Sequence, residues 1–417
     1  MSKKSESGVG MRAMLGRALR GVVGLGLAAV ALAASAQENV ITFGTALSLT
    51  GKMSPEGSRV KEGYDLYVKQ INAKGGIKVG ADNYKIKIVL YDDKANPTEA
   101  TNTVRKLIDR DGTKFILGFC CSGPTAAVAS FIAKEDVVML VGTAADRSIT
   151  TQGATNLFRT RPPGDYTGAA AGTFVGKRGV KTLAVIGSLD VGIYQQYLAA
   201  FEREFTKAGG RIVAKETFAM GDRDMTAQLT KVRGLNPDAV FVMGYVEQVA
   251  FVIRQAHELG LKQPRYGFSG GNEAQFLKVA TSEQMEGAWD LRPTELTVEA
   301  LGPTAKAFVD NYTKKFNEPP TPNAPYAYDQ VYVLRDAIQK AGTVTDTKKV
   351  IAEIAKLAPP AEVVMKYAPI DGKMFDENGQ AYISNGAFQW QKGKWVYVAD
   401  LPSDAAAYSK FLRTLRK

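Results

Sequence analysis

The chain has 417 residues, of which 45% are hydrophobic and 23% are charged. Five of its 53 Lys and Arg residues and one of its 42 Asp and Glu residues lie within the first 36 positions, so the remaining chain carries 48 basic and 41 acidic side chains. Because these basic residues occur in pairs and not in a concentrated stripe, the pattern argues against a nucleic-acid partner. The 381 residues after position 36 are long for one domain and natural for two.

The beginning of the chain has the pattern of an export signal. Basic residues precede an apolar run at 21–34, and Ala34-Ser35-Ala36 supplies the small side chains that a signal peptidase requires. The run is too short to form a permanent membrane anchor. We therefore expect residues 1–36 to be a signal peptide, cleaved after Ala36, and the protein to be exported to the periplasm.

From residue 41 onward, short apolar strands alternate with helices in two successive blocks. In the first block we expect strands at 41–47, 85–91, 115–119 and 137–142, and helices at 57–73, 97–110 and 124–135. In the second block we expect strands at 183–187, 211–218, 239–244 and 265–268, and helices at 193–208, 225–233 and 247–259. Continuous apolar runs are typical of parallel strands covered on both faces, so the predicted fold class is α/β.

The last part of the chain is richer in helices. Helices are predicted at 303–316, 326–340 and 347–356, and a final short helix at 403–416. Residues 374–395 have the pattern of a hairpin, with turn chemistry at 376–379. The stretch 158–163, between the two blocks, is expected to carry one crossover between two lobes.

A ligand is expected at the carboxyl ends of the strands, where loops lead into helix N-termini. In residues 118–124 a strand ends and a helix begins, with Pro124 at the first helical position and Ser122 or Gly123 as the N-cap. The free amides and the positive end of this helix would favour a carboxylate, and Ser122 adds a hydroxyl. An ordinary structural cap is the alternative interpretation. Residues 142–145, Tyr245 and residues 188–192 are further candidates.

The sequence contains none of the common signatures of catalysis. It has no glycine-rich dinucleotide loop, no phosphate-loop lysine and no His-Glu-x-x-His. The single histidine, His257, lies in a polar helical stretch and is expected at the surface. We therefore predict a protein that is not an enzyme and that uses no cofactor and no metal.

The only two cysteines, Cys120 and Cys121, are adjacent. They can form a strained vicinal disulfide or remain as buried thiols. Neighbouring Cα atoms lie closer together than the usual spacing in a disulfide, which favours the thiols.

Five segments carry a resemblance to a known family. They are Ile71-Asn72-Ala73-Lys74-Gly75-Gly76-Ile77, Tyr91-Asp92-Asp93 with Asn96-Pro97, residues 118–125, Arg254-Gln255-Ala256 with Gly260-Leu261, and Tyr326-Ala327-Tyr328-Asp329. In this order and spacing they resemble the leucine/isoleucine/valine-binding family of periplasmic solute-binding proteins. The resemblance implies the type I periplasmic binding fold, with two doubly wound parallel-sheet lobes joined by three hinge strands that close on a solute.

The resemblance also implies how the chain is divided between the lobes. The first lobe would contain 38–162 and 293–370, and the second would contain 163–292 and 371–400. Residues 401–417 would form a C-terminal helix. The expected partners are a small solute and an ABC permease of the inner membrane, with the protein acting as a monomer.

Three positions match ligand-contacting residues of that family. Ser122 matches a serine that holds the ligand carboxylate, and Thr143 matches a residue whose backbone contacts the ligand. Tyr245 matches a ligand-contacting tyrosine of the second lobe.

Other positions depart from the family pattern. Ala145 stands where amino-acid binders tend to have a threonine, and Ser269 about where they have the glutamate that holds the ligand ammonium. Glu56 replaces a pocket tyrosine. Ala95 stands where a cysteine would pair with the one matched by Cys121, so that disulfide is absent.

The missing glutamate bears on the identity of the solute, because a buried ammonium without a charged partner costs several kcal/mol. Either one of four acids, Glu273, Glu56, Asp190 or Asp329, takes its place, or the solute is an aromatic or aliphatic acid without an ammonium group. The predicted function is solute binding for an ABC importer of the branched-chain amino acid type. The alternative is a periplasmic sensor that engages a receptor.

Overall fold

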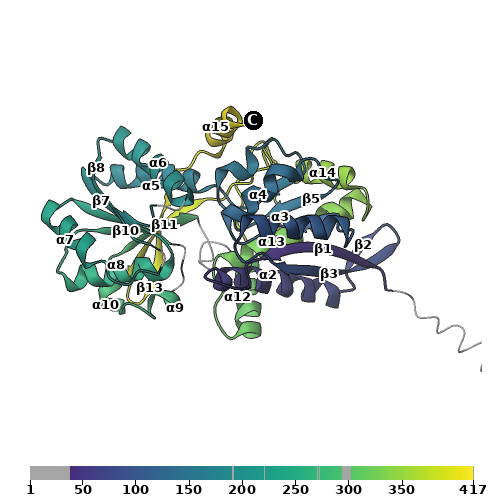
Figure 1. The fold of residues 1–417 in the computed structure, drawn as a ribbon, viewed down its shortest axis with the longest axis horizontal. Coiled ribbons are helices and arrows are strands. Elements are labelled where there is room, and N and C mark those ends of the chain that lie inside the picture. Colours follow the sequence, from purple (N-terminus) through teal and green to yellow (C-terminus); the bar gives the residue numbers. More distant parts are fainter. Residues whose placement is uncertain are drawn as a thin grey trace, which may run out of the picture. The chain divides into compact units, whose positions relative to one another are not determined.

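The computed structural model describes residues 38–189, 192–219, 221–269, 271, 273–293 and 302–416. The predicted signal peptide lies outside these residues. Residues 41–417 form one compact unit that contains two β-sheets (Figure 1). Among the described helices, none has the length and apolar character required to cross a membrane.

The first sheet has six strands in the order β2-β3-β1-β4-β5-β6. Strands β1, β4, β5 and β6 are parallel neighbours, and β2 and β3 form an antiparallel pair at one edge. The strands are β1 (Val40–Leu47), β2 (Ile77–Val79), β3 (Asp82–Asp92), β4 (Phe115–Leu117), β5 (Val138–Val141) and β6 (Leu157–Arg159). The helices of this part are α2 (Ser54–Ala73), α3 (Pro97–Asp109), α4 (Ser122–Ile132), α12 (Pro303–Phe316), α13 (Asn323–Ala341) and α14 (Thr347–Lys356).

Alternate residues of the central strands bury opposite faces of the first sheet, as the two-residue period of a strand requires. Phe115 and Leu117 pack in one hydrophobic cluster with α2, α13 and α14. Ile116, which lies between them, packs in the other cluster with α3 and α4. Helices therefore cover both faces, which explains why these strands have continuous apolar sequences (Figure 1).

The second sheet has seven strands in the order β13-β12-β11-β10-β9-β7-β8. Strands β7 to β11 are parallel neighbours, whereas β12 and β13 are antiparallel. The strands are β7 (Thr182–Gly187), β8 (Arg211–Thr217), β9 (Ala239–Met243), β10 (Arg265–Phe268), β11 (Trp289–Pro293), β12 (Asn385–Gln391) and β13 (Lys394–Leu401). The helices are α5 (Gly164–Lys177), α6 (Gly192–Lys207), α7 (Thr226–Leu235), α8 (Val246–Glu258), α9 (Glu273–Phe276), α10 (Ser282–Met285) and α15 (Ala405–Leu415).

The structure confirms the α/β class and the two-lobed fold, with two corrections to its details. Each sheet is mixed and not wholly parallel, because antiparallel strands close one edge. The hairpin predicted at 374–395 is displaced: it consists of β12 and β13, which are joined at Lys392 and Gly393, both with positive φ. Residues 376–379 do form a turn, but only the isolated bridge between Phe375 and Ala381 flanks it. The Asp-Glu-Asn-Gly signal is chemically stronger than Lys-Gly, which is why it misplaced the hairpin.

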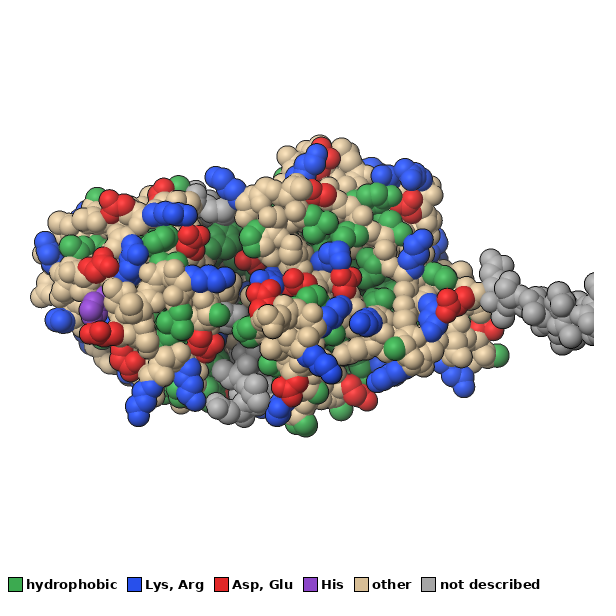
Figure 2. Space-filling view, turned by 90° about the horizontal axis from the view of Figure 1, so that it is seen from below, with side chains coloured by type: hydrophobic (Ala, Val, Ile, Leu, Met, Phe, Trp, Pro, Cys, Tyr) green, Lys and Arg blue, Asp and Glu red, His purple; other side chains and the backbone are tan. Residues whose placement is uncertain are grey.

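The chain passes between the two sheets three times: between β6 and α5, between β11 and α12, and before β12. Helices α13 and α14, although late in the chain, pack on the first sheet. The exact lobe boundaries given above stay a prediction. Figure 2 shows acidic and basic side chains interspersed over the face that it presents.

Candidate functional site

A cavity of about 730 Å³ lies where loops from both sheets meet. This volume is within the range of small-molecule sites. The first part of the chain contributes the N-termini of α2 and α4 and the loop after β5, and the second part contributes the N-termini of α6 and α8 and the ends of β10 and β11. The location agrees with the expectation that ligands lie at the carboxyl ends of parallel strands.

The cavity brings together most of the residues that the sequence singles out. Its lining includes Glu56, Ser122, Thr143, Ala145, Tyr245 and Ser269. Asp190, the seventh, lies outside the described residues. The structure therefore collects these side chains from both parts of the chain, whereas their contacts with a solute stay a prediction.

Helix α4 begins earlier than expected. Its N-cap is Cys121, Ser122 is the first helical residue, and no side chain caps the helix. Ser122 instead accepts a hydrogen bond from the Ala145 amide to its Oγ, at 3.2 Å. The first amides of a helix have no intrahelical acceptor, so those of Ser122 and Gly123 remain available for an anion at this wall of the cavity.

Arg161 lines the same cavity and was not predicted as a site residue. Its Nη1 donates to the Thr143 carbonyl at 2.8 Å, and Thr143 in turn donates from Oγ1 to the Phe119 carbonyl at 2.7 Å. Within the described chain, Arg161 forms no ion pair with a carboxylate. A partly buried guanidinium that lines a cavity and forms no ion pair with a carboxylate is suited to receive one from a ligand. The one indication of this role in the sequence is that Arg161 lies in the crossover predicted at 158–163.

Glu56, in the first turn of α2, lies close enough to Arg161 to feel its positive charge. Burial raises its pKa, against the opposing effects of the Arg161 and Arg59 cations and a hydrogen bond from Asn323. Arg59 is itself paired with Glu62 and Glu318. Glu56 is therefore protonated more readily than an exposed glutamate and can donate a hydrogen bond when it is neutral.

An aromatic wall faces these groups from the second part of the chain. Tyr194 packs edge-on against Tyr245 and Phe268, with ring centroids 6.0 Å and 6.3 Å away. Burial raises the pKa of both tyrosines, and the charge of Glu56 contributes to both shifts. The sequence pattern assigns Tyr194 to core packing; the residue is buried, but it also lines the cavity.

Most acids that could bind a ligand ammonium, either beside Ser269 or among the four substitutes named above, already bind other groups of the protein. Ser269 binds Asp290 through both its amide and its hydroxyl at 3.2 Å, and Asp290 forms a buried ion pair with Arg292 at 3.0 Å. Asp329 is fully buried and accepts from the amides of Val364 and Met365. Neither Asp329 nor Glu273 is part of the cavity lining. Of the described candidates, only Glu56 remains at the cavity.

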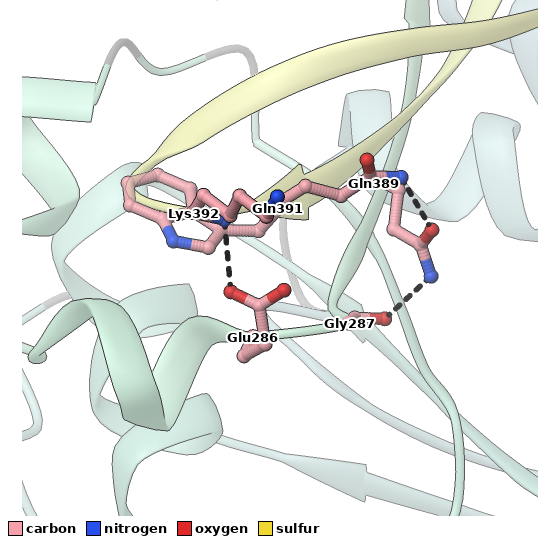
Figure 3. Close-up of a pocket in the computed structure, with 6 residues that line it drawn as sticks. Glu286, Gly287, Gln389, Gln391 and Lys392 are labelled. Atoms are coloured by element: carbon pink, nitrogen blue, oxygen red, sulfur yellow. Dashed lines mark hydrogen bonds between the residues drawn. The ribbon is translucent and has the colours of Figure 1, made fainter.

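A second cavity, of about 320 Å³, lies near the β12–β13 turn (Figure 3). Its polar groups bind one another: the Lys392 amide donates to Glu286 at 3.1 Å, and Gln391 donates to Gln389 at 3.0 Å. None of the predicted site residues lines it. The larger cavity is therefore the candidate functional site.

A family model described as "periplasmic binding protein" matches residues 40–394. This chain belongs to that family. Its members are solute-binding proteins and not enzymes, and the chain is a solute-binding protein.

Similar proteins are found among curated sequences and solved structures. The Leu/Ile/Val-binding protein BraC3 of Rhizobium johnstonii is 29% identical, covering 85% of this chain and 93% of its own. The branched-chain amino acid substrate-binding protein LivJ of Streptococcus pneumoniae, solved with isoleucine, is 26% identical with a TM-score of 0.74 and covers 87% and 100%. A solute-binding protein of R. palustris, solved with benzoate, shares the fold at 22% identity with a TM-score of 0.75, covering 88% and 99%.

Proposed function

We propose that the exported chain captures a small solute bearing a carboxylate group in the periplasm and delivers it to an ABC permease of the inner membrane. The observation that carries the solute class is Arg161, a cation that forms no ion pair in the described chain and lines the same cavity as the free amides at the start of α4. Together they supply charge and directed donors to one carboxylate.

The rest of the cavity favours an acid with an apolar or aromatic body over an amino acid. Tyr194, Tyr245 and Phe268, from the second part of the chain, add aromatic surface to the lining. The acid beside Ser269 is already paired with Arg292. Three acids line the cavity, Glu56, Asp146 and Glu318. Asp146 already accepts from the Ser148 amide and Glu318 is paired with Arg59, while the raised pKa of Glu56 disfavours the charge that a contact with an ammonium group needs.

Thermal unfolding with candidate solutes tests the solute class. We expect benzoate and related acids to stabilise the protein, by about 2.7 kcal/mol at a hundred times the dissociation constant, and leucine to give a smaller effect. Benzoate shares the carboxylate with leucine but has no ammonium group. Stabilisation by leucine and not by any acid lacking an amino group would contradict the proposed preference.

Two substitutions test the anion site. Arg161→Gln and Ser122→Ala should each weaken binding of the stabilising acid, Arg161→Gln by roughly 10- to 100-fold because a charge-assisted hydrogen bond is lost. Arg203→Gln, on the exposed side of α6, is the matched control and should bind normally. Unchanged affinity in the Arg161 variant, measured by calorimetry, would remove this residue from the site.

A further inference from the structure

Cys120 and Cys121 form a second reactive feature of the cavity wall. They are the only cysteines of the chain, both are free thiols, and both line the cavity. Cys120 is buried, whereas Cys121 is partly exposed. Their Sγ atoms lie 2.6 Å apart, so little movement separates them from the bonding distance of about 2.05 Å.

Buried polar groups adjoin the two thiols. The Cys120 Sγ donates to the Ser48 hydroxyl at 3.2 Å, and Ser48 donates to Asp93 Oδ1 at 2.6 Å. Asp93 is fully buried, its other carboxylate oxygen has no hydrogen-bond partner, and burial raises its pKa. This chain of hydrogen bonds offers a route by which a thiol proton can leave the pair. The hydrogen bond from Cys121 lowers the pKa of Cys120, which favours Cys120 as the thiolate.

We propose that Cys120 and Cys121 form a reversible redox-modification site, converted to a vicinal disulfide by exchange with a low-molecular-weight disulfide that enters the cavity. The accessible Cys121 thiol passes its proton to the neighbouring Cys120 thiolate as its sulfur attacks one sulfur of the reagent, whose S–S bond breaks to release the first thiol. The Ser48–Asp93 chain then takes the proton from Cys120. The Cys120 thiolate then attacks the Cys121 sulfur and releases the second thiol. The two protons of the protein thiols end on the two released thiols, and the reagent takes up the two electrons.

Two features of the chain make this modification reversible and consequential. Adjacent Cα atoms are about 3.8 Å apart, below the usual disulfide spacing of about 4.4–6.8 Å, and a disulfide under such constraint is easily reduced. Cys121 is also the N-cap of α4, and its carbonyl accepts from the Thr125 amide and hydroxyl at 3.2 Å and 2.7 Å. Closing the ring therefore turns the peptide that precedes the free amides of Ser122 and Gly123.

Intact-mass spectrometry after incubation with oxidised glutathione tests the modification. The folded protein should lose two hydrogen atoms and both titratable thiols, and a reductant should restore them. Cys120→Ser should instead keep glutathione on Cys121, because no second thiol resolves the mixed disulfide. Cys121→Ser should react slowly, since its remaining thiol is buried. A wild-type protein that keeps glutathione, or that is oxidised only after unfolding, would overturn the proposal.

Calorimetry on the reduced and oxidised forms, with benzoate and with leucine, tests the consequence for binding, which rests on the proposed function. Oxidation is expected to weaken the binding of whichever compound binds the reduced form. Equal affinity in both forms would overturn the link to the anion site. The mass measurement needs no solute, so a failure of both compounds to bind would count against the proposed function and not against the redox site.

Discussion

At the scale of single residues, Glu56 couples solute binding to protons. Burial already raises its pKa, while the charge of Arg161 opposes that shift. A bound carboxylate would neutralise Arg161 and add a second negative charge, so the pKa of Glu56 should rise further on binding. Binding of an acid should then take up a proton.

We predict that the affinity for an acid decreases as the pH rises through the pKa of Glu56, which lies above its ordinary value of 4.5. Calorimetry in buffers of different ionisation enthalpy measures both the affinity and the proton uptake. Glu56→Gln should abolish both effects and bind the acid at least as well at high pH. Asp310→Asn, an exposed acid of α12, is the control. Proton release in place of uptake would indicate a ligand ammonium beside Glu56.

How much of the site the sequence reveals depends on the kind of residue. Ser122 and Tyr245 could be placed at the cavity because each follows a strand, and strand ends of parallel sheets converge. Arg161 and Tyr194 could not, because a cation in a crossover and an aromatic on a helix have several possible environments. Only the tertiary contacts show that Arg161 forms no ion pair in the described chain and that Tyr194 reaches the cavity.

At the scale of elements, Asp329 connects α13 to the segment that returns toward the second sheet. Its carboxylate accepts from the amides of Val364 and Met365 and from the hydroxyl of Tyr367. Burial raises the pKa of Asp329 to about 7, more than these hydrogen bonds lower it. The match to the family at Asp329 is therefore explained by the structural role of this residue and not by contact with the solute.

Because the folded state holds the Asp329 proton more tightly than the unfolded chain, this contribution to stability is complete below about pH 4. It is lost as the pH rises through about 7. We expect the free energy of unfolding to fall by roughly 2–4 kcal/mol over this interval on account of Asp329. The Asp329→Asn variant should be less stable than wild type at pH 5, because the NH2 group of the new side chain meets the amide donors of Val364 and Met365. Its free energy of unfolding should also depend less on pH.

Asp336→Asn, on the same helix, is the matched control, since Asp336 is paired with Lys340 near the surface. Denaturant unfolding between pH 5 and 8 measures the slopes. A wild-type slope that persists in the Asp329 variant would assign the pH dependence to other groups.

The elements differ in how clearly the sequence specifies them. Helices α12 and α14 have the predicted bounds, because Pro303 starts one and Asp346 caps the other through the Lys349 amide. Helix α5 was not predicted, since its Gly-rich sequence is typical of loops. Its glycines allow close packing instead: a Cβ at Gly168 or Gly172 would lie within 2.3 Å of the backbone of α6.

At the scale of the whole molecule, the order of strands and helices follows from hydrophobic periodicity, whereas the assignment of late helices to the first sheet does not. Residues 303–356 have an apolar face that suits either lobe. The structure places α13 on α2 and the first sheet through the buried cluster of Tyr64, Tyr326 and Val331. The expectation that these helices return to the first lobe came from the resemblance and not from their amphipathic pattern.

A solute that contacts both walls of the cavity should favour a more closed arrangement of the chain, because only that arrangement satisfies both sets of contacts. Arg161 and the start of α4 lie on one wall, and Tyr194 and Tyr245 lie on the other. We predict that a saturating acid reduces the radius of gyration measured by small-angle X-ray scattering. Tyr245→Ala should retain the anion site, bind more weakly and close less at saturation. An unchanged radius with the solute bound would mean that recognition needs no closure.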